Sequence, residues 1–236
     1  MNAIQKPFQK STMKNLFFEP FVGEHYAEGI NGKKILVLGA SFYCNRVNCP
    51  FFAQCTSVEN KNSEPFDQRC PEYIPHGKQL HLEPSYCVED APATYVHFAD
   101  YMGKHLGTDD YDTIWSHMAF TNYVQFMLPA EPDKFRTTES SDLSERDFNA
   151  FIEVLQLLQP DIVIVWGTVI NSRLKEHNEY LTDLRELHET EWYVCHLEVP
   201  GIKHQIALIN PYHPSSSAWY SGLEQFDKFF LRLLNL

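Results

Sequence analysis

Three short apolar runs, two of them closed by glycine, most constrain what this chain can fold into. They cover residues 34–38, 113–120 and 161–166, and Gly39 and Gly167 close the first and the third. None of the three alternates between apolar and polar residues over its length. Such runs are typical of strands that are buried on both faces of a parallel sheet. We therefore predict three interior strands.

Helical patterns separate these runs. Residues 92–106 carry apolar side chains at helical spacing, and Ser144 begins a second such stretch that ends before Pro160. We predict a further helix from Thr168 and an amphipathic helix from about Ser217 onward. Strands that alternate with helices predict an α/β fold, a three-layer α/β/α domain around a central, mostly parallel sheet. Two more strand predictions complete the pattern: residues 192–197 and 205–209.

The domain organisation is predicted to be simple. Residues 1–236 form one domain, because no shift in composition and no linker divides the chain. Residues 1–14 are expected to be a loose N-terminal segment. Residues 41–86 are rich in Cys, Pro and Asn and are expected to be a long loop or insertion, and long loops of this kind commonly carry function.

Polar residues gather where the predicted strands end. The four blocks are Gly39-Ala-Ser-Phe-Tyr-Cys44, Phe120-Thr-Asn122, Val163-Ile-Val-Trp-Gly167 and His213-Pro-Ser-Ser-Ser217. In open α/β sheets, ligands bind in the loops at the carboxyl ends of the strands. We therefore expect these blocks to form one site.

The order and placement of these blocks resemble the uracil-DNA glycosylase superfamily. Members have a glycine-led loop after the first strand, an Asn after the second, a Trp-Gly strand end and a His-Pro-Ser loop before the last helix. The resemblance implies a uracil-DNA glycosylase-like fold. It also implies recognition of a flipped or free pyrimidine-type base, with hydrolysis of its N-glycosidic bond if the protein is an enzyme.

The resemblance also implies residue roles. Asn122 would read the base through its amide, and Tyr43 would shape the pocket. His213 would stabilise the negative charge on the departing base. Ser41 occupies the position where the best-known members carry an Asp, so a hydroxyl that orients water would replace a carboxylate. The N–H groups of the serines after Pro214 would hold a phosphate near a helix start: Ser215, Ser216 and Ser217.

Four cysteines crowd into the predicted loop: Cys44, Cys49, Cys55 and Cys70. Their spacing matches neither a zinc ribbon nor a ferredoxin run, so we expect no cofactor. The alternative is a zinc or iron–sulfur site, with His76 or His81 as an extra ligand. Cys195 lies in a predicted strand and is expected to belong to the core.

The formal charge of −12 argues against tight nonspecific binding to a phosphate backbone. The expected partner is DNA, single-stranded or carrying uracil or a damaged base, or else a nucleotide-like small molecule. No apolar run approaches the roughly 20 residues of a membrane span, and no apolar signal stretch begins the chain. We therefore expect a cytoplasmic protein without membrane contact.

Three hypotheses on function stay open from the sequence. The first is a divergent glycosylase. The second is a non-catalytic module on the same fold that binds a base, a nucleotide or a protein. The third is a metal or redox protein built on the cysteines.

Overall fold

The computed structural model describes residues 13–50, 93–131, 136–186 and 193–235. The strands are β1 (Phe21–Val22), β2 (Ile35–Gly39), β3 (Phe42–Cys44), β4 (Met118–Asn122), β5 (Met127–Pro129), β6 (Ile162–Val165), β7 (Leu181–Glu186), β8 (Tyr193–Leu197) and β9 (Ile206–Ile209). The helices are α5 (Ala93–Leu106), α6 (Tyr111–Ser116), α7 (Glu145–Leu158), α8 (Asn171–Glu176) and α9 (Trp219–Leu233), with short 3-10 turns at Ser140–Asp142 and Asn178–Tyr180.

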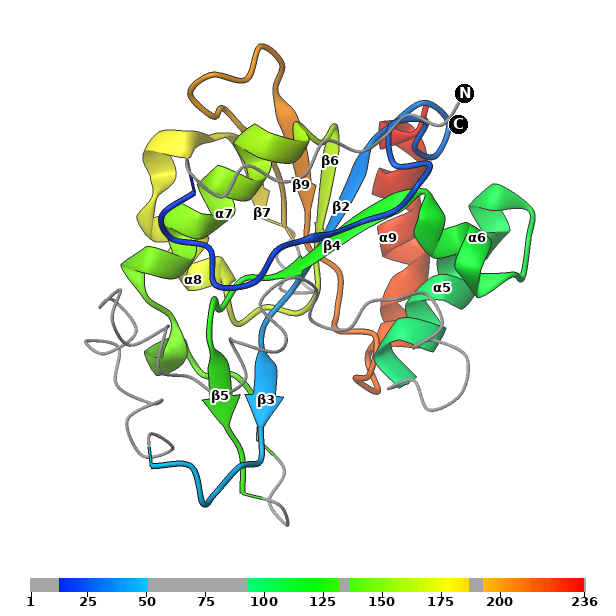
Figure 1. Ribbon diagram of the computed structural model, residues 1–236. Coiled ribbons are helices and arrows are strands. Elements are labelled where there is room, and N and C mark those ends of the chain that lie inside the picture. Colours follow the sequence, from blue (N-terminus) through cyan, green and yellow to red (C-terminus); the bar gives the residue numbers. More distant parts are fainter. Residues whose placement is uncertain (1–12, 51–92, 132–135, 187–192, 236) are drawn as a thin grey trace.

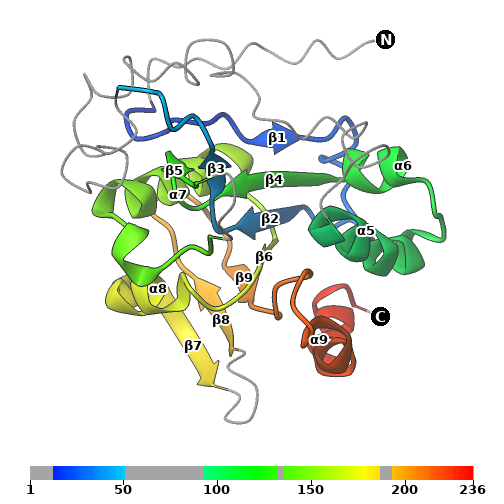
Figure 2. The same ribbon diagram turned by 90° about the horizontal axis from the view of Figure 1, so that it is seen from below.

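The central sheet has seven strands in the order β1-β4-β2-β6-β9-β8-β7. Four of its strands, β4, β2, β6 and β9, run parallel to one another, and they follow one after another in Figure 2. The pairings toward both edges, of β1 with β4 and of β7 and β8 with their neighbours, are antiparallel. The predicted α/β class with a mostly parallel central sheet is confirmed.

Helices cover both faces of the sheet. In Figure 1, α7 and α8 lie on one side of the strands, and α5, α6 and α9 lie on the other. Along β2, Leu36 and Leu38 pack into the core under α7, whereas Ile35 and Val37 pack into the core under α5 and α9. Alternate residues of a strand point to opposite faces, so an apolar run with no alternation fills both cores.

The start of α7 follows from its sequence. The carboxylate of Asp147 accepts a hydrogen bond from the backbone N–H of Ser144 at 2.8 Å, and the Ser144 hydroxyl caps the Asp147 N–H in return. The helix ends at Gln159, which has a φ of 45°, just before Pro160. The predicted helices 92–106 and that from Ser217 are likewise present as α5 and α9.

The prediction of one strand over 113–120 was wrong in its first half. Residues 111–116 form α6, and β4 begins only at Met118. Asp110 caps this helix by accepting a hydrogen bond from the Thr113 N–H at 3.0 Å. Ile114 and Trp115 are buried from the helix rather than from a strand. A short apolar run does not distinguish a buried helix from a buried strand, and here the capping Asp favours the helix.

Several elements fall outside the sequence predictions. The expected loop 41–86 opens with β3, which pairs in parallel with β5 in a separate two-stranded sheet. Strand β7 was not predicted, and the helix expected from Thr168 is present as α8 but begins at Asn171. Residues 1–12 and 51–86 of the predicted loose segment and loop lie outside the described residues. In the described part, no helix is long and apolar enough to cross a membrane.

Candidate functional site at the carboxyl ends of the central strands

The carboxyl ends of the four middle strands lie along one edge of the sheet, and they bring together residues from distant parts of the chain. Gly39, at the end of β2, pairs with Asn122 at the end of β4. Gly167 follows β6, His213 follows β9, and the Gly167 N–H donates to the Pro211 carbonyl at 3.1 Å. We call Gly39, Asn122, Gly167 and His213 the strand-end site. Asn122 and His213 belong to the two outer strands of the four or to the loop after them, and the two glycines belong to the strand ends between them.

The spacing of the strands sets the width of this site. Asn122 belongs to β4 and His213 follows β9, with β2 and β6 between them. Three intervals of ordinary strand spacing separate the two outer strands by about 14 Å. The Asn122 side chain nevertheless lies against Gly39 and the His213 side chain against Gly167, so both side chains reach inward from the outer strands.

The Asn122 side chain lies directly over Gly39. A Cβ atom added to Gly39 would lie 2.2 Å from Asn122 Oδ1, so this placement of the amide requires glycine. Asn122 is only 3% exposed, yet its amide has no hydrogen-bond partner among the residues that the structure describes. The amide can therefore donate and accept a hydrogen bond with a ligand at the strand ends.

His213 is half-buried, and its contacts favour one neutral tautomer. The backbone N–H of Ser215 donates to His213 Nδ1 at 3.3 Å, and the Ser215 hydroxyl lies 2.8 Å from the same atom. A backbone N–H can only donate, so Nδ1 is unprotonated and Nε2 carries the proton. Burial lowers the pKa of His213 and so favours the neutral imidazole. Its ring also meets the Trp166 ring edge-on, with centroids 6.1 Å apart.

The loop that carries His213 is held from two sides. The Ser216 N–H donates to the His213 carbonyl at 2.8 Å, which closes a turn before α9. On the other side, His97 of α5 donates from Nδ1 to the Pro214 carbonyl at 2.9 Å. These contacts fix the position of the imidazole relative to the sheet.

The predicted phosphate-binding serines lie in this loop and differ in their surroundings. Ser215 and Ser217 are exposed, and the Ser215 hydroxyl contacts His213. The Ser216 hydroxyl is buried without a hydrogen-bond partner among the described residues. All three precede α9, whose helical residues begin at Trp219.

Three hydroxyl groups meet beside the first loop. Ser41 Oγ lies 2.5 Å from Thr138 Oγ1, and the Tyr43 hydroxyl lies 3.0 Å from the same oxygen. Thr138 is buried, whereas Tyr43 is 40% exposed. The sequence predicted Ser41 and Tyr43 but not Thr138, which comes from the polar stretch before α7. The Ser41 hydroxyl is thus already engaged by another hydroxyl.

Gln125 is hydrogen-bonded to the backbone of Asn122. Its Nε2 donates to the Asn122 carbonyl at 2.7 Å, and its backbone N–H donates to Asp147 Oδ1 at 2.7 Å. Gln125 is 2% exposed. No motif in the sequence marks Gln125, because its partners other than Asn122 are far away along the chain.

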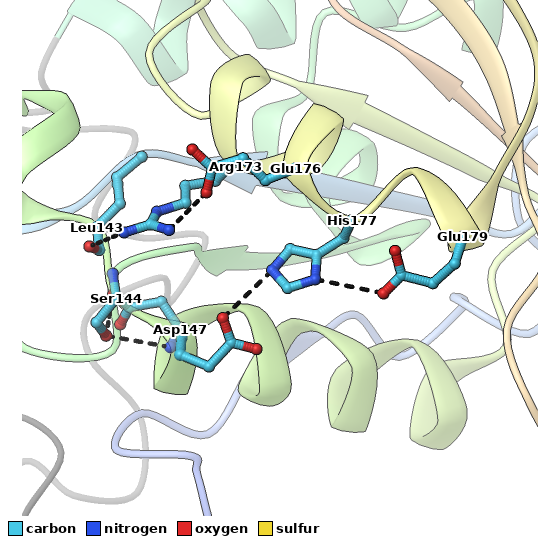
Figure 3. A network of polar contacts seen from close by, with 8 residues as sticks. Leu143, Ser144, Asp147, Arg173, Glu176, His177 and Glu179 are labelled. Atoms are coloured by element: carbon cyan, nitrogen blue, oxygen red, sulfur yellow. Dashed lines mark hydrogen bonds and ion pairs between the residues drawn. The ribbon is translucent and has the colours of Figure 1, made fainter.

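Further contacts hold Asp147 and the start of α7 in place, as Figure 3 shows. Arg173 donates to the Leu143 carbonyl at 3.3 Å and forms an ion pair with Glu176 at 2.6 Å. His177 stacks on the Phe148 ring with centroids 3.5 Å apart. His177 also lies between two carboxylates, at 3.4 Å from Glu145 and 3.6 Å from Glu179. These contacts connect α8 and the turn after it to the first turn of α7.

The cysteine hypothesis is only partly covered by the described residues. Cys44 and Cys49 are half-buried, whereas Cys55, Cys70, His76 and His81 lie outside the described residues. Within the described part, no group of three or more His, Cys, Asp or Glu residues could hold a metal ion. Cys195 is buried in the core, where burial raises the pKa of its thiol to about 12.

Comparison with known proteins adds no support to the resemblance to uracil-DNA glycosylases, which depends on the chain's own residues alone. No protein-family model matches the sequence, and no curated protein matches it.

Proposed function

We propose that this protein recognises a pyrimidine-type base held out of a nucleic-acid stack and hydrolyses its N-glycosidic bond. The observation that carries the proposal is the buried Asn122 amide, which has no partner among the described residues. An amide offers one donor and one acceptor side by side, which complements the N–H and C=O edge of uracil. Glycines at the neighbouring strand ends let the Asn122 and His213 side chains lie close over the sheet edge.

The chemistry assigned to His213 follows from its tautomer. When the glycosidic C–N bond breaks, its electron pair leaves with the base as negative charge. A neutral imidazole that presents Nε2–H can donate to an oxygen of that base, and its Nδ1 is kept unprotonated by the Ser215 N–H. A water molecule then adds its oxygen to the sugar carbon and releases a proton. Ser41 is the hydroxyl proposed to orient that water.

A second candidate function is base binding without hydrolysis. The observation that favours it is the contact between the hydroxyls of Ser41 and Thr138, at the position where the family's Asp would stabilise a cationic sugar. The net charge of −12 fits a small ligand better than a long polyanion. In this case the partner would be a free base or a nucleotide-like molecule.

The experiment that separates these functions uses a single-stranded oligonucleotide with one uracil. The purified protein is incubated with it at low salt, and alkali then cleaves any abasic site. Hydrolysis predicts strand breaks that fall by about 10²–10³ in rate in His213→Ala, as expected for loss of one donor to the developing charge. Uracil binding without strand breaks would support the second function. If the protein neither binds uracil nor produces strand breaks, both functions are overturned.

Two control measurements complete this experiment. Asn122→Ala should abolish uracil binding in either case, because it removes the proposed base reader. Ser41→Asp restores a carboxylate and should raise a weak excision activity if the missing charge limits the rate. Metal analysis of the purified chain tests the separate hypothesis that the cysteines hold zinc or an iron–sulfur cluster.

A further inference from the structure

Gln125 lies outside the strand-end site but is hydrogen-bonded directly to one of its residues. Its Nε2 donates to the Asn122 carbonyl at 2.7 Å. Its Oε1 accepts from the backbone N–H groups of Phe17 at 3.0 Å and Phe18 at 3.1 Å. Both polar ends of a buried side chain are therefore occupied, one by the proposed base reader and the other by the N-terminal segment.

The N-terminal segment 14–18 is itself fastened to α7. The Glu153 carboxylate accepts from the Lys14 N–H at 3.1 Å and from the Asn15 side-chain amide at 2.8 Å. Arg146 Nε donates to the Asn15 carbonyl at 3.0 Å. The segment therefore has a fixed position when its next two residues reach Gln125.

The same segment supports both loops that carry candidate site residues. The Phe18 ring meets the Phe42 ring edge-on at 5.2 Å, and Phe42 stands between Ser41 and Tyr43. The Phe17 ring lies 4.8 Å from that of Phe126, which follows Gln125. These aromatic contacts and the Gln125 hydrogen bonds place both loops against the N-terminal segment.

We propose that Gln125 is a positioning residue that, braced by the N-terminal segment 14–18, holds Asn122 in the orientation needed to read a base. This inference rests on the proposed function, because it assigns Asn122 its role. Gln125 itself would touch no ligand. It would fix the Asn122 backbone, so that the amide lies over Gly39 before a base arrives, and less ordering is then needed on binding.

The chain offers a discriminating substitution at this position. Gln125→Glu keeps oxygens that accept from Phe17 and Phe18, but it loses the donor to Asn122 and sets a carboxylate against the Asn122 carbonyl. Gln125→Leu removes both sets of hydrogen bonds. Asn15→Ala loosens only the far end of the segment and serves as the matched control.

The test measures uracil binding by titration calorimetry and unfolding by urea for each variant. We expect Gln125→Glu to weaken uracil binding by about 10-fold or more, since a buried acceptor loses its donor, and to lower the urea midpoint as well, because a carboxylate is buried beside that acceptor. In a double-mutant cycle, Gln125→Glu should add nothing further in the Asn122→Ala background. Unchanged uracil affinity in Gln125→Glu, or equal losses in Asn15→Ala, would overturn the positioning role.

A measurement without ligand keeps this test separate from that of the proposed function. The Asn122 side-chain NH₂ signal is identified in an NMR spectrum by its disappearance in Asn122→Ala. We expect it to be single in the natural protein and shifted or doubled in Gln125→Glu. An unmoved signal would refute the positioning of Asn122 by Gln125. Failure of the natural protein to bind uracil would refute the proposed function alone.

Discussion

At the scale of single residues, the space above Gly39 is set by one missing side chain. A Cβ there would lie 2.2 Å from Asn122 Oδ1 and 3.0 Å from Phe120 Cζ. We expect Gly39→Ala to fold with the Asn122 amide displaced, at a cost of about 1–3 kcal/mol, and to lose uracil binding. Urea unfolding and calorimetric titration check the two parts.

The matched control for this substitution is Gly103→Ala in α5. A Cβ at Gly103 would meet the Thr108 carbonyl at 2.4 Å, away from the strand-end site. This variant should lose stability and keep its uracil affinity. If both variants lost affinity in proportion to stability, the argument that Gly39 makes room for the amide would be wrong.

His213 predicts how stability responds to acid. Burial lowers the pKa of His213 in the folded chain below its ordinary value near 6.5. As pH falls below about 6.5, the unfolded chain takes up a proton first, so the free energy of unfolding falls until the folded pKa is reached. His213→Gln should remove the part of this decrease in the free energy of unfolding that His213 causes. Above about pH 7.5, His213 contributes nothing to the pH dependence of stability.

Urea unfolding between pH 7.5 and 5 measures this effect. His105 contributes in the same direction, because burial also lowers its pKa and outweighs the nearby Asp227 carboxylate. The single variant should therefore flatten the acid slope only in part, and His105→Gln combined with it should flatten the slope further. A slope identical to that of the natural protein would contradict the lowered pKa of His213.

At the scale of elements, the cap of α7 joins helix stability to the candidate site. The Asp147 carboxylate accepts from the Ser144 N–H and, through its other oxygen, from the Gln125 N–H at 2.7 Å. Ser144→Ala removes one capping hydroxyl, which typically costs about 1 kcal/mol. Asp147→Ala also leaves the buried Gln125 N–H unpaired, so it should cost about 1–3 kcal/mol more.

The urea midpoints of the two variants, at unchanged m-value, compare these costs. Asp147→Ala should in addition weaken uracil binding, whereas Ser144→Ala should leave it within about twofold. Equal loss of stability in the two variants would mean that the bond from Gln125 to Asp147 contributes nothing.

The elements also show where sequence patterns are informative. Strands β2 and β6 were predictable because both faces are buried, and α7 because Ser144 and Asp147 cap it locally. The sequence pattern over residues 113–120 did not separate helix from strand. Its apolar residues enter the core first from α6 and then from β4. Strands β3 and β5 are short and pair only with each other, so no long apolar run marks them.

The candidate site divides in the same way. Asn122 and His213 follow strands, so the rule that ligands bind at strand ends selected them. Thr138 and Gln125 belong to no such pattern. Their roles come from contacts with Ser41 and Phe17, residues that are far away in the sequence, and only the folded chain brings them together.

At the scale of the whole molecule, the net charge of −12 bears on any binding of nucleic acid. The proposed phosphate contacts are the hydroxyl and backbone N–H of Ser217 near the start of α9, because the N–H groups of Ser215 and Ser216 already donate to His213. Such contacts neutralise no phosphate charge, so few counterions would be released on binding. We therefore expect the affinity for a single-stranded uracil oligonucleotide to depend weakly on salt.

A designed charge locates this contact on the molecule. Ser217 is exposed in the loop before α9, and Ser217→Lys adds one cation beside the proposed phosphate. The plot of log affinity against log salt should steepen by about 0.7, the value for one added phosphate contact on a single strand. Gln205→Lys places the same charge just before β9, at the opposite edge of the sheet, and should leave the slope unchanged. Equal steepening in both variants would mean that the nucleic acid senses only the overall charge, and the phosphate would then have to be sought away from the His213 loop.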